Sequence, residues 1–123
     1  MNIVITGASS GIGFEAALEF SLNKENKVVC IARSAEKLRK LLEIARGITP
    51  DCQLLPVAFD IVNDDYSVLL PFLKEKLGTV DILVNNAGSL INKPFTETTV
   101  QDFAQMLETN VLGHFNMSQQ LLP

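Results

Sequence analysis

The sequence predicts a single α/β domain built on a parallel sheet with helices on both faces. Short apolar runs alternate with longer stretches of helical periodicity, which is typical of repeated strand and helix units. These apolar runs are continuous and do not alternate with polar residues, as expected of strands that helices cover on both sides. A glycine-rich turn joins the first run directly to a helical stretch. We expect strands at residues 2–6, 27–32, 53–59 and 81–85.

Three helices are expected in the first part of the chain. The first follows the glycine-rich turn. The second begins after Ser34, a good N-cap residue, and ends at Gly47. The third extends from about Asp64 to Gly78, and Pro71 inside it should bend or split the helix.

A fourth helix is expected to begin at Thr98 and to extend to the last residues. Thr98 and Gln101 have the spacing of a capping box. The helical periodicity gathers apolar side chains on one face, which we expect to point into the core. These side chains are Phe103, Met106, Leu107, Val111 and Phe115.

Connections between parallel strands are right-handed, and this rule fixes the expected topology. The first two helices should cover one face of the sheet and the last two the other, with the four strands in the order 3-2-1-4. The fourth strand would then be an edge. An apolar, unpaired edge invites pairing with another chain, so we expect a homo-oligomer.

Length and composition exclude several classes of protein. The chain has 123 residues, of which 47% are hydrophobic and 20% charged, as in an ordinary globular domain. Its net charge is −4 and its basic residues are scattered, which disfavours binding to nucleic acids or to a membrane surface. Met1 leads directly into a strand, with no signal sequence or membrane-spanning run, so a cytoplasmic location is expected. Cys30 and Cys52 have no metal-ligand spacing; we expect buried packing residues and no metal site.

The glycines of the first turn predict an anion-binding site. Gly7, Gly11 and Gly13 stand between a strand and a helix, where they leave the first backbone N–H groups of that helix open. These donors and the helix dipole suit a pyrophosphate. The pattern TGxxxGxG differs from the GxxxxGK[ST] phosphate loop and from the GxGxxG fingerprint. The alternative is a glycine-rich turn without a ligand.

Four motifs in this order resemble the short-chain dehydrogenase/reductase family. They are TGASSGIG at 6–13, FDI at 59–61, NNAG at 85–88 and TNVLG at 109–113. The resemblance implies a Rossmann-type, doubly wound parallel sheet, an NAD(P) cofactor and a small-molecule carbonyl or alcohol substrate. It covers only the first half of the family's pattern, so residues 1–123 should form the dinucleotide-binding part of the fold.

The resemblance also implies roles for individual residues. Small residues are needed beside the cofactor, because larger side chains would occupy its volume. Asp60 and Ile61 would flank the adenine ring, although Asp60 could instead be a capping residue. The residues expected along the pyrophosphate and the riboses are Gly7, Ser9, Ser10, Gly11, Ile12, Asn86, Ala87 and Gly88, with Gly13 allowing the first helix to pack closely on the sheet.

Arg33 favours NADP(H) over NAD(H). Folds that prefer NAD usually carry a carboxylate at the end of the second strand, where this chain has Ala32 followed by Arg33. A guanidinium can hold a 2′-phosphate by two hydrogen bonds. Ser10, where relatives that prefer NADP(H) often carry a second basic residue, argues in the other direction. The alternative for Arg33 is a solvated loop residue.

Asn110 is the candidate catalytic residue of this chain. From the sequence alone it is a satisfied structural asparagine, whereas the resemblance implies that it positions a water in a proton relay. His114, the only histidine, is expected to be a packing or surface residue, and Tyr66, the only tyrosine, a core residue.

The residues that perform hydride transfer in the family, a serine and a YxxxK pair, lie beyond the motifs found here. The chain should therefore bind the cofactor but not turn over alone. The alternative function is a non-catalytic dinucleotide-binding or scaffold module.

Overall fold

The computed structural model describes residues 1–122 and contains one four-stranded parallel sheet. Its strands are β1 (Asn2–Thr6), β2 (Lys27–Ala32), β3 (Gln53–Ala58) and β4 (Ile82–Val84). Their order is β3-β2-β1-β4, which confirms the predicted topology and the edge position of β4. Strands β3 and β4 are shorter than predicted. Strand β4 begins at Ile82, one residue later than predicted. The residue before it, Asp81, instead accepts a hydrogen bond from the Asn2 N–H through its side chain, at 2.7 Å.

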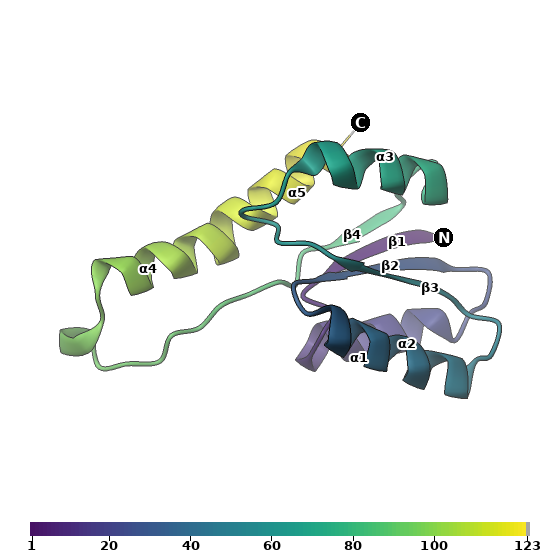
Figure 1. Cartoon of the computed structure of the whole chain (residues 1–123), viewed down its shortest axis with the longest axis horizontal. Helices are drawn as coiled ribbons and strands as arrows, with labels where there is room; N and C mark the ends of the chain where they lie inside the picture. Colours follow the sequence, from purple (N-terminus) through teal and green to yellow (C-terminus); the bar gives the residue numbers. More distant parts are fainter. Residues whose placement is uncertain (123) are drawn as a thin grey trace.

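Helices cover both faces of the sheet (Figure 1). Helices α1 (Gly11–Ser21) and α2 (Ala35–Ile48) lie on one face, and α3 (Tyr66–Leu77) and α5 (His114–Leu121) on the other. Successive residues of a strand point to opposite faces of the sheet and belong to two separate hydrophobic cores. Ile3 and Ile5 pack with α1 and α2, whereas Val4 packs with α3 and with Met117 of α5. Because the strands are apolar on both sides, both faces of the sheet must be covered, and the helices on the two faces do this.

The second and third helices begin close to the predicted residues. Ser34 caps α2, its hydroxyl accepting a hydrogen bond from the Lys37 N–H. Asp65 caps α3 in the same manner. Helix α2 continues one residue past Gly47, and α3 continues through Pro71 without being split, because only one backbone donor is missing there.

The capping box of the fourth helix differs from the prediction by one residue. Helix α4 (Val100–Leu107) is capped by Thr99, and the Asp102 carboxylate accepts a hydrogen bond from the Thr99 N–H at 3.1 Å. The predicted pair of Thr98 and Gln101 is wrong, because the Thr98 hydroxyl donates to the Pro94 carbonyl at 3.0 Å. That bond belongs to the short helix η1 (Phe95–Glu97).

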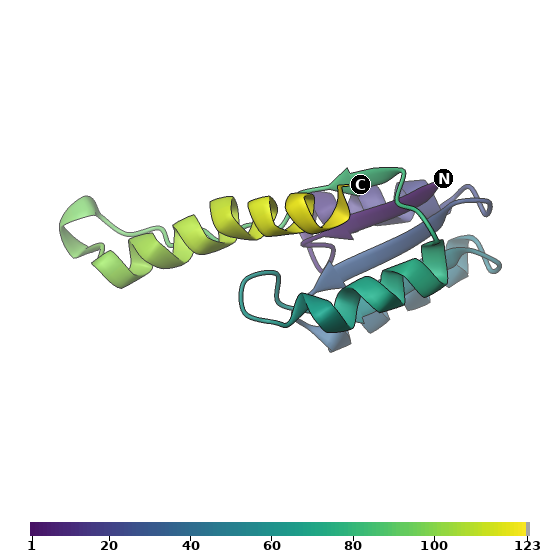
Figure 2. The same cartoon turned by 90° about the horizontal axis from the view of Figure 1, so that it is seen from above.

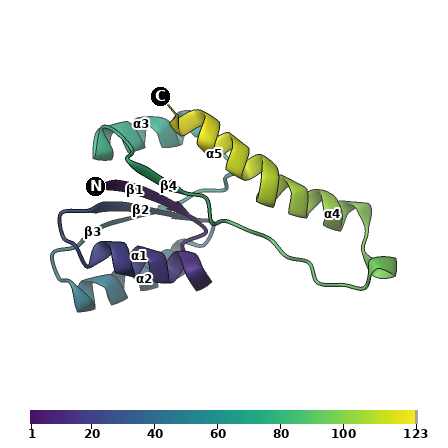
Figure 3. The same cartoon turned by 180° about the vertical axis from the view of Figure 1, so that it is seen from behind.

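The fourth helix is interrupted and projects beyond the sheet. A π-helical segment, η2 (Glu108–Gly113), joins α4 to α5, and the three form one long rod (Figure 2). Residues 88–94 extend from the end of the sheet out to η1, below the rod in the view of Figure 3. We call α4, η1, η2 and residues 88–94 the arm. No helix in residues 1–122 is long and apolar enough to span a bilayer.

The prediction that the fourth helix points these five apolar side chains into the core is wrong. No layer of the described structure covers the arm, so Phe103, Leu107, Val111 and Phe115 are exposed. Met106 is half-buried, and its sulfur accepts a hydrogen bond from the Ile91 N–H at 3.5 Å. From Gly113 onward the rod packs against the rest of the domain: an added Cβ on Gly113 would lie 2.6 Å from Ile61 Cδ1 in the loop after β3, and Met117 packs in the core with Val4.

The two cysteines are both free thiols. Cys30 is fully buried in β2, and Cys52 is half-buried just before β3. Burial, and to a smaller extent the neighbouring Cys52, raises the pKa of the Cys30 thiol to about 12. A thiol with so high a pKa is inert, which agrees with a packing role.

Candidate functional site

A cavity of about 490 Å³ lies at the carboxyl ends of the strands. Its wall is formed by the end of β2, by the segments that follow β1, β2, β3 and β4, and by the arm. Open α/β sheets bind ligands at this end of their strands. The lining residues are Gly7, Ser9, Ser10, Ile31, Ala32, Arg33, Lys37, Phe59, Asp60, Ile61, Val62, Asn63, Asn86, Ala87, Gly88, Gln105, Glu108 and Thr109.

The turn after β1 is packed tightly against the segment after β4. Gly7 has a φ of +66°, and a Cβ there would lie 2.7 Å from Ala87 Cα. A Cβ on Gly13 would lie 2.5 Å from the Gly7 carbonyl oxygen. Both positions therefore exclude any side chain, one by backbone conformation as well as space and the other by space alone.

The N-terminus of α1 is open. Ser10 occupies the N-cap position without forming a side-chain hydrogen bond, and the first turn holds no acidic residue. In contrast, α2, α3 and α4 each begin with a side-chain cap. Backbone N–H groups without a partner carry the positive end of the helix dipole. The start of α1 therefore suits an anion.

Thr6, which the sequence analysis quoted only as part of a motif, holds the 86–88 segment in place. Its hydroxyl is fully buried, accepts hydrogen bonds from the N–H groups of Asn86 and Ala87 at 3.1 and 3.0 Å, and donates to the Val84 carbonyl. Asn86 in turn donates from Nδ2 to the Gly7 carbonyl at 3.1 Å. A buried polar residue at a strand end is the signal that identifies Thr6.

Two residues of the rod form hydrogen bonds with the 86–88 segment or with Ser89, the residue that follows it. Asn110, in η2, forms two hydrogen bonds with the backbone of Ser89, at 2.8 Å each. His114 donates from Nε2 to the Ala87 carbonyl, so it is neither a plain packing residue nor a free surface residue. Asn110 itself is exposed and is not part of the cavity wall. Asn110 and His114 are four residues apart, and residues with this spacing lie on the same face of a helix. This spacing was the signal in the sequence that could have linked His114 to the site.

Asp60 organises the loop after β3. Its carboxylate accepts hydrogen bonds from the N–H groups of Val62 and Asn63 and from the Asn63 side chain. Partial burial would raise the pKa of Asp60, but these hydrogen bonds together with the nearby Arg33 charge lower it below its usual value. Asp60 thus lines the cavity as a carboxylate and closes the turn after β3, whereas the cap of the next helix, α3, is Asp65.

Below this loop, Tyr66 donates a hydrogen bond to the Ile61 carbonyl at 2.8 Å. Its ring packs edge-on against Phe59, with ring centroids 5.1 Å apart. Partial burial, and secondly the Asp60 charge, raise the pKa of Tyr66 to about 12. Tyr66 therefore supports the cavity wall from beneath, as a residue of the core.

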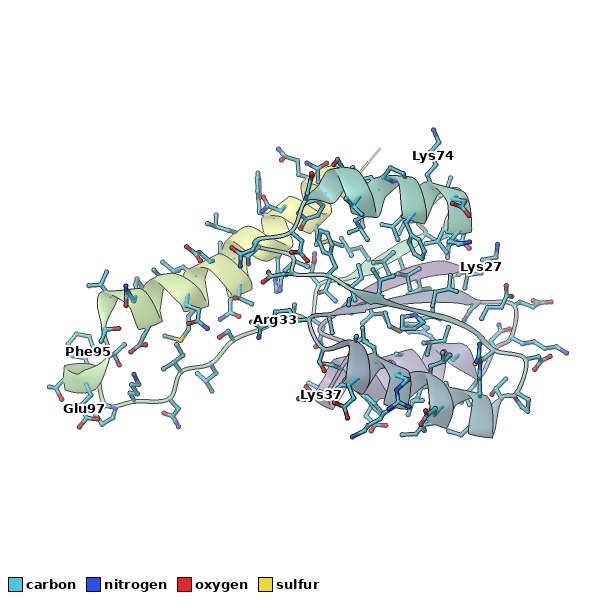
Figure 4. All side chains as sticks on the ribbon, viewed as in Figure 1. Lys27, Arg33, Lys37, Lys74, Phe95 and Glu97 are labelled. Atoms are coloured by element: carbon cyan, nitrogen blue, oxygen red, sulfur yellow. The ribbon has the colours of Figure 1, made fainter. Side chains whose placement is uncertain are left out.

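Positive charge at the cavity comes from two residues, of which the sequence analysis named only one. Arg33, directly after β2, and Lys37, in the first turn of α2, both line it. Figure 4 shows both at the end of the sheet from which the arm projects. The position of Lys37 could be recognised only once the start of α2 was placed beside the strand ends.

Gly11, Ile12 and Gly13 lie outside the cavity wall. Gly13 is buried beneath it, while Gly11 and Ile12 line a separate hollow on α1 with Glu15 and Glu19. The Ile12 side chain is 82% exposed. The other residues assigned to the cofactor surround the cavity. They are Gly7, Ser9, Ser10, Arg33, Asp60, Ile61, Asn86, Ala87 and Gly88.

A sequence model described as short chain dehydrogenase matches residues 1–123. The chain belongs to the short-chain dehydrogenase family. Serine 3-dehydrogenase of Agrobacterium fabrum is 36% identical over 124 residues, a match that covers 98% of this chain and 47% of that protein. The chain thus spans about half the length of the curated relatives it matches.

Solved structures of short-chain dehydrogenases superimpose closely on the fold. An actinorhodin polyketide ketoreductase crystallised with NADPH matches with a TM-score of 0.88 at 30% identity, covering 98% of this chain and 46% of that one. A 7α-hydroxysteroid dehydrogenase crystallised with NADH matches with a TM-score of 0.85 at 35% identity and the same coverage. Membership of this oxidoreductase family with its NAD(P)-binding Rossmann fold is therefore established. The two cofactors show that the family likeness does not decide between NADP(H) and NAD(H).

Proposed function

We propose that this chain is the nucleotide-binding part of an NADP(H)-dependent oxidoreductase that interconverts a carbonyl and an alcohol. The observation that carries the proposal is the single cavity that joins the turn after β1, Arg33, the loop after β3 and the 86–88 segment. A bound dinucleotide would supply the hydride. The chain's own residues bind and orient it.

Each wall of the cavity suits one part of a dinucleotide. The turn at Gly7, Ser9 and Ser10 and the uncapped start of α1 suit the diphosphate. Asp60 and Ile61 would flank the adenine. Ala87 and Gly88 offer little side-chain volume on the wall assigned to the ribose, and Thr6 and His114 fix the Ala87 backbone by hydrogen bonds.

The preference for NADP(H) depends on Arg33. No carboxylate stands at the end of β2, where Ala32 precedes Arg33. Arg33 forms no ion pair within residues 1–122, so its guanidinium is available to a 2′-phosphate. One charge-assisted hydrogen bond of about 1.5–3 kcal/mol corresponds to roughly 10- to 100-fold in affinity.

Catalysis would need groups that these 123 residues do not contain. The only tyrosine, Tyr66, is followed four positions later by Leu70, so the sequence holds no YxxxK pair. Asn110 is the one residue of this chain that we assign to the proton relay, and its bonds to Ser89 set its orientation. We therefore propose that the chain binds NADP(H) but is inactive alone.

The test is a fluorescence titration of NADPH and of NADH against the chain, its Arg33→Ser variant and an Arg46→Ser control. Arg46 lies in the last turn of α2, at the other end of that helix from the cavity. We expect tighter binding of NADPH by the unchanged chain and the control, and loss of that preference in Arg33→Ser. Equal affinities for the two cofactors that do not change with Arg33→Ser would overturn the cofactor assignment.

A non-catalytic dinucleotide-binding module is the second candidate, because the cavity accounts for cofactor binding and not for turnover. Both candidates bind the cofactor, so titration does not separate them. The coding sequence does: a serine and a YxxxK pair encoded after Pro123 support the enzyme, whereas a stop codon at that point supports the module.

We also propose that the chain associates with itself. The rod exposes a row of large apolar side chains, including Val100 and Phe103, and β4 is an unpaired edge strand. Surfaces of this kind mark sites of protein association. Light scattering coupled to gel filtration should show a dimer or larger species, and a strict monomer would contradict the proposal. The expected cytoplasmic location stays a prediction.

A further inference from the structure

Lys37 is a second cation at the cavity. Its side chain lines the same cavity as Arg33 and forms no ion pair within residues 1–122. Its neighbours on the exposed face of α2 behave differently, since Arg39 pairs with Glu43 at 2.6 Å and Lys40 with Glu36 at 3.8 Å. The ammonium of Lys37 is therefore available to a ligand of the cavity.

The position of Lys37 is set by the start of α2. The Ser34 hydroxyl accepts a hydrogen bond from the Lys37 N–H at 3.3 Å, which fixes the first helical turn directly after Arg33. Helix α2 therefore begins close to the end of β2, and Lys37 is among the residues that line the cavity. The two cations approach the cavity from adjacent elements.

The carboxylates of the cavity oppose the binding of a phosphate, so a second cation would assist it. Asp60 and Glu108 also line it, and the Asp60 carboxylate is drawn electrostatically to Arg33. Arg33 alone would meet a phosphate with part of its charge already compensated. A phosphate monoester carries nearly two negative charges near neutral pH, so a second positive charge improves the balance.

We propose that Lys37 is a specificity-determining residue that, together with Arg33, recognises the 2′-phosphate of NADP(H). This inference rests on the proposed binding of NADP(H). The two side chains have complementary roles: the guanidinium of Arg33 can hold two oxygens in a fixed geometry, whereas the ammonium of Lys37 acts as a mobile point charge on the third. The absence of a basic residue at Ser10 is compensated from α2 instead.

The experiment compares NADPH, NADH and adenosine 2′,5′-bisphosphate by calorimetric titration of the full chain. The variants are Lys37→Gln, Lys37→Arg and Lys40→Gln, the last a control on the same helix whose partner is Glu36. We expect Lys37→Gln to reduce the affinity for NADPH and for the bisphosphate about 3- to 10-fold, and to leave the affinity for NADH unchanged. The lower end of this range is expected because solvent screens the charge of Lys37. Lys37→Arg and Lys40→Gln should bind as the unchanged chain does.

Added salt provides an independent readout of the charge. Exposed ionic contacts weaken with ionic strength, so Lys37→Gln should show a smaller loss of NADPH affinity between low and high salt. Circular dichroism of each variant checks that the fold is retained.

The outcomes separate this inference from the proposed function. Unchanged NADPH affinity in Lys37→Gln, while Arg33→Ser loses it, overturns the role of Lys37 and leaves the proposed function standing. An equal loss of NADPH and NADH also overturns it, because the effect would then not concern the 2′-phosphate. If the unchanged chain binds neither cofactor, the proposed function itself fails.

Discussion

The Asn110 side chain holds the backbone of Ser89 by two hydrogen bonds. Oδ1 accepts a hydrogen bond from the Ser89 N–H, and Nδ2 donates to the Ser89 carbonyl, both at 2.8 Å. This pair ties the π-helical segment to the end of the 86–88 segment. The Gly88 backbone lies close by, and a Cβ there would be 3.4 Å from Asn110 Oδ1.

Replacing Asn110 should loosen this segment before it affects the fold. In Asn110→Leu both hydrogen bonds are lost, and since each is solvent-exposed we expect a total loss of about 1 kcal/mol in the free energy of unfolding. Amide hydrogen exchange at Ser89 should accelerate, while exchange in β1 and β2 should not change. Unaltered protection at Ser89 would show that the pair does not hold the segment.

Thr6 is expected to contribute more, because its hydroxyl is buried. Thr6→Val keeps the shape but leaves the N–H groups of Asn86 and Ala87 without their partner. We expect a loss of about 2–4 kcal/mol. Thr6→Ser keeps the hydroxyl, removes one methyl group and should cost about 1 kcal/mol. Chemical denaturation measures both, and equal losses in the two variants would contradict the assignment.

Two glycine substitutions should have opposite effects. Gly13→Ala places a Cβ against the Gly7 carbonyl, which cannot rotate away, and should destabilise the chain by roughly 1–3 kcal/mol. Gly47→Ala adds a Cβ into open space within α2 and should stabilise by about 0.5–1 kcal/mol. Melting temperatures test the contrast. A tolerated Gly13→Ala would mean that α1 does not pack on the turn as closely as described.

Tyr66 should ionise at an unusually high pH. Partial burial, aided by the Asp60 charge, raises its pKa from 10.0 to about 12. The folded chain favours the neutral hydroxyl, so this contribution to stability is complete below pH 10 and is lost as the pH rises toward 12. Because Tyr66 is the only tyrosine, ultraviolet absorbance reports its ionisation directly.

The unfolded chain in denaturant is the control for this titration, and it should ionise near the ordinary value of 10.0. Circular dichroism identifies the pH range in which the chain stays folded. A native titration that coincides with the unfolded one would show that Tyr66 is not held beneath the loop.

The sheet could be predicted because its information is local and redundant. Continuous apolar runs, each followed by a helical stretch, admit few topologies once crossovers are right-handed, and the order β3-β2-β1-β4 follows. Element ends were less certain. Thr98 and Thr99 are both followed by a polar residue three positions later, and only the distant bond from Thr98 to the Pro94 carbonyl decides between them.

The orientation of the rod could not be predicted, because helical periodicity shows which side chains share a face but not what covers it. Phe103 and Phe115 were expected on one apolar face in the core, and the described structure leaves both exposed. The same limit applies to the cavity. Motifs indicated the turn, Asp60 and the 86–88 segment, but Lys37 and Glu108 reach the wall only through the placement of their helices.

The most direct test of the account is the map of backbone amide shifts that NADP⁺ produces in a nuclear magnetic resonance titration of the chain. The account predicts that the largest changes fall on Gly7, Ser9 and Ser10, on Arg33 and on residues 86–88, which surround one cavity. Changes confined to the outer hollow at Ile12 and Glu15, or none at millimolar NADP⁺, would contradict it.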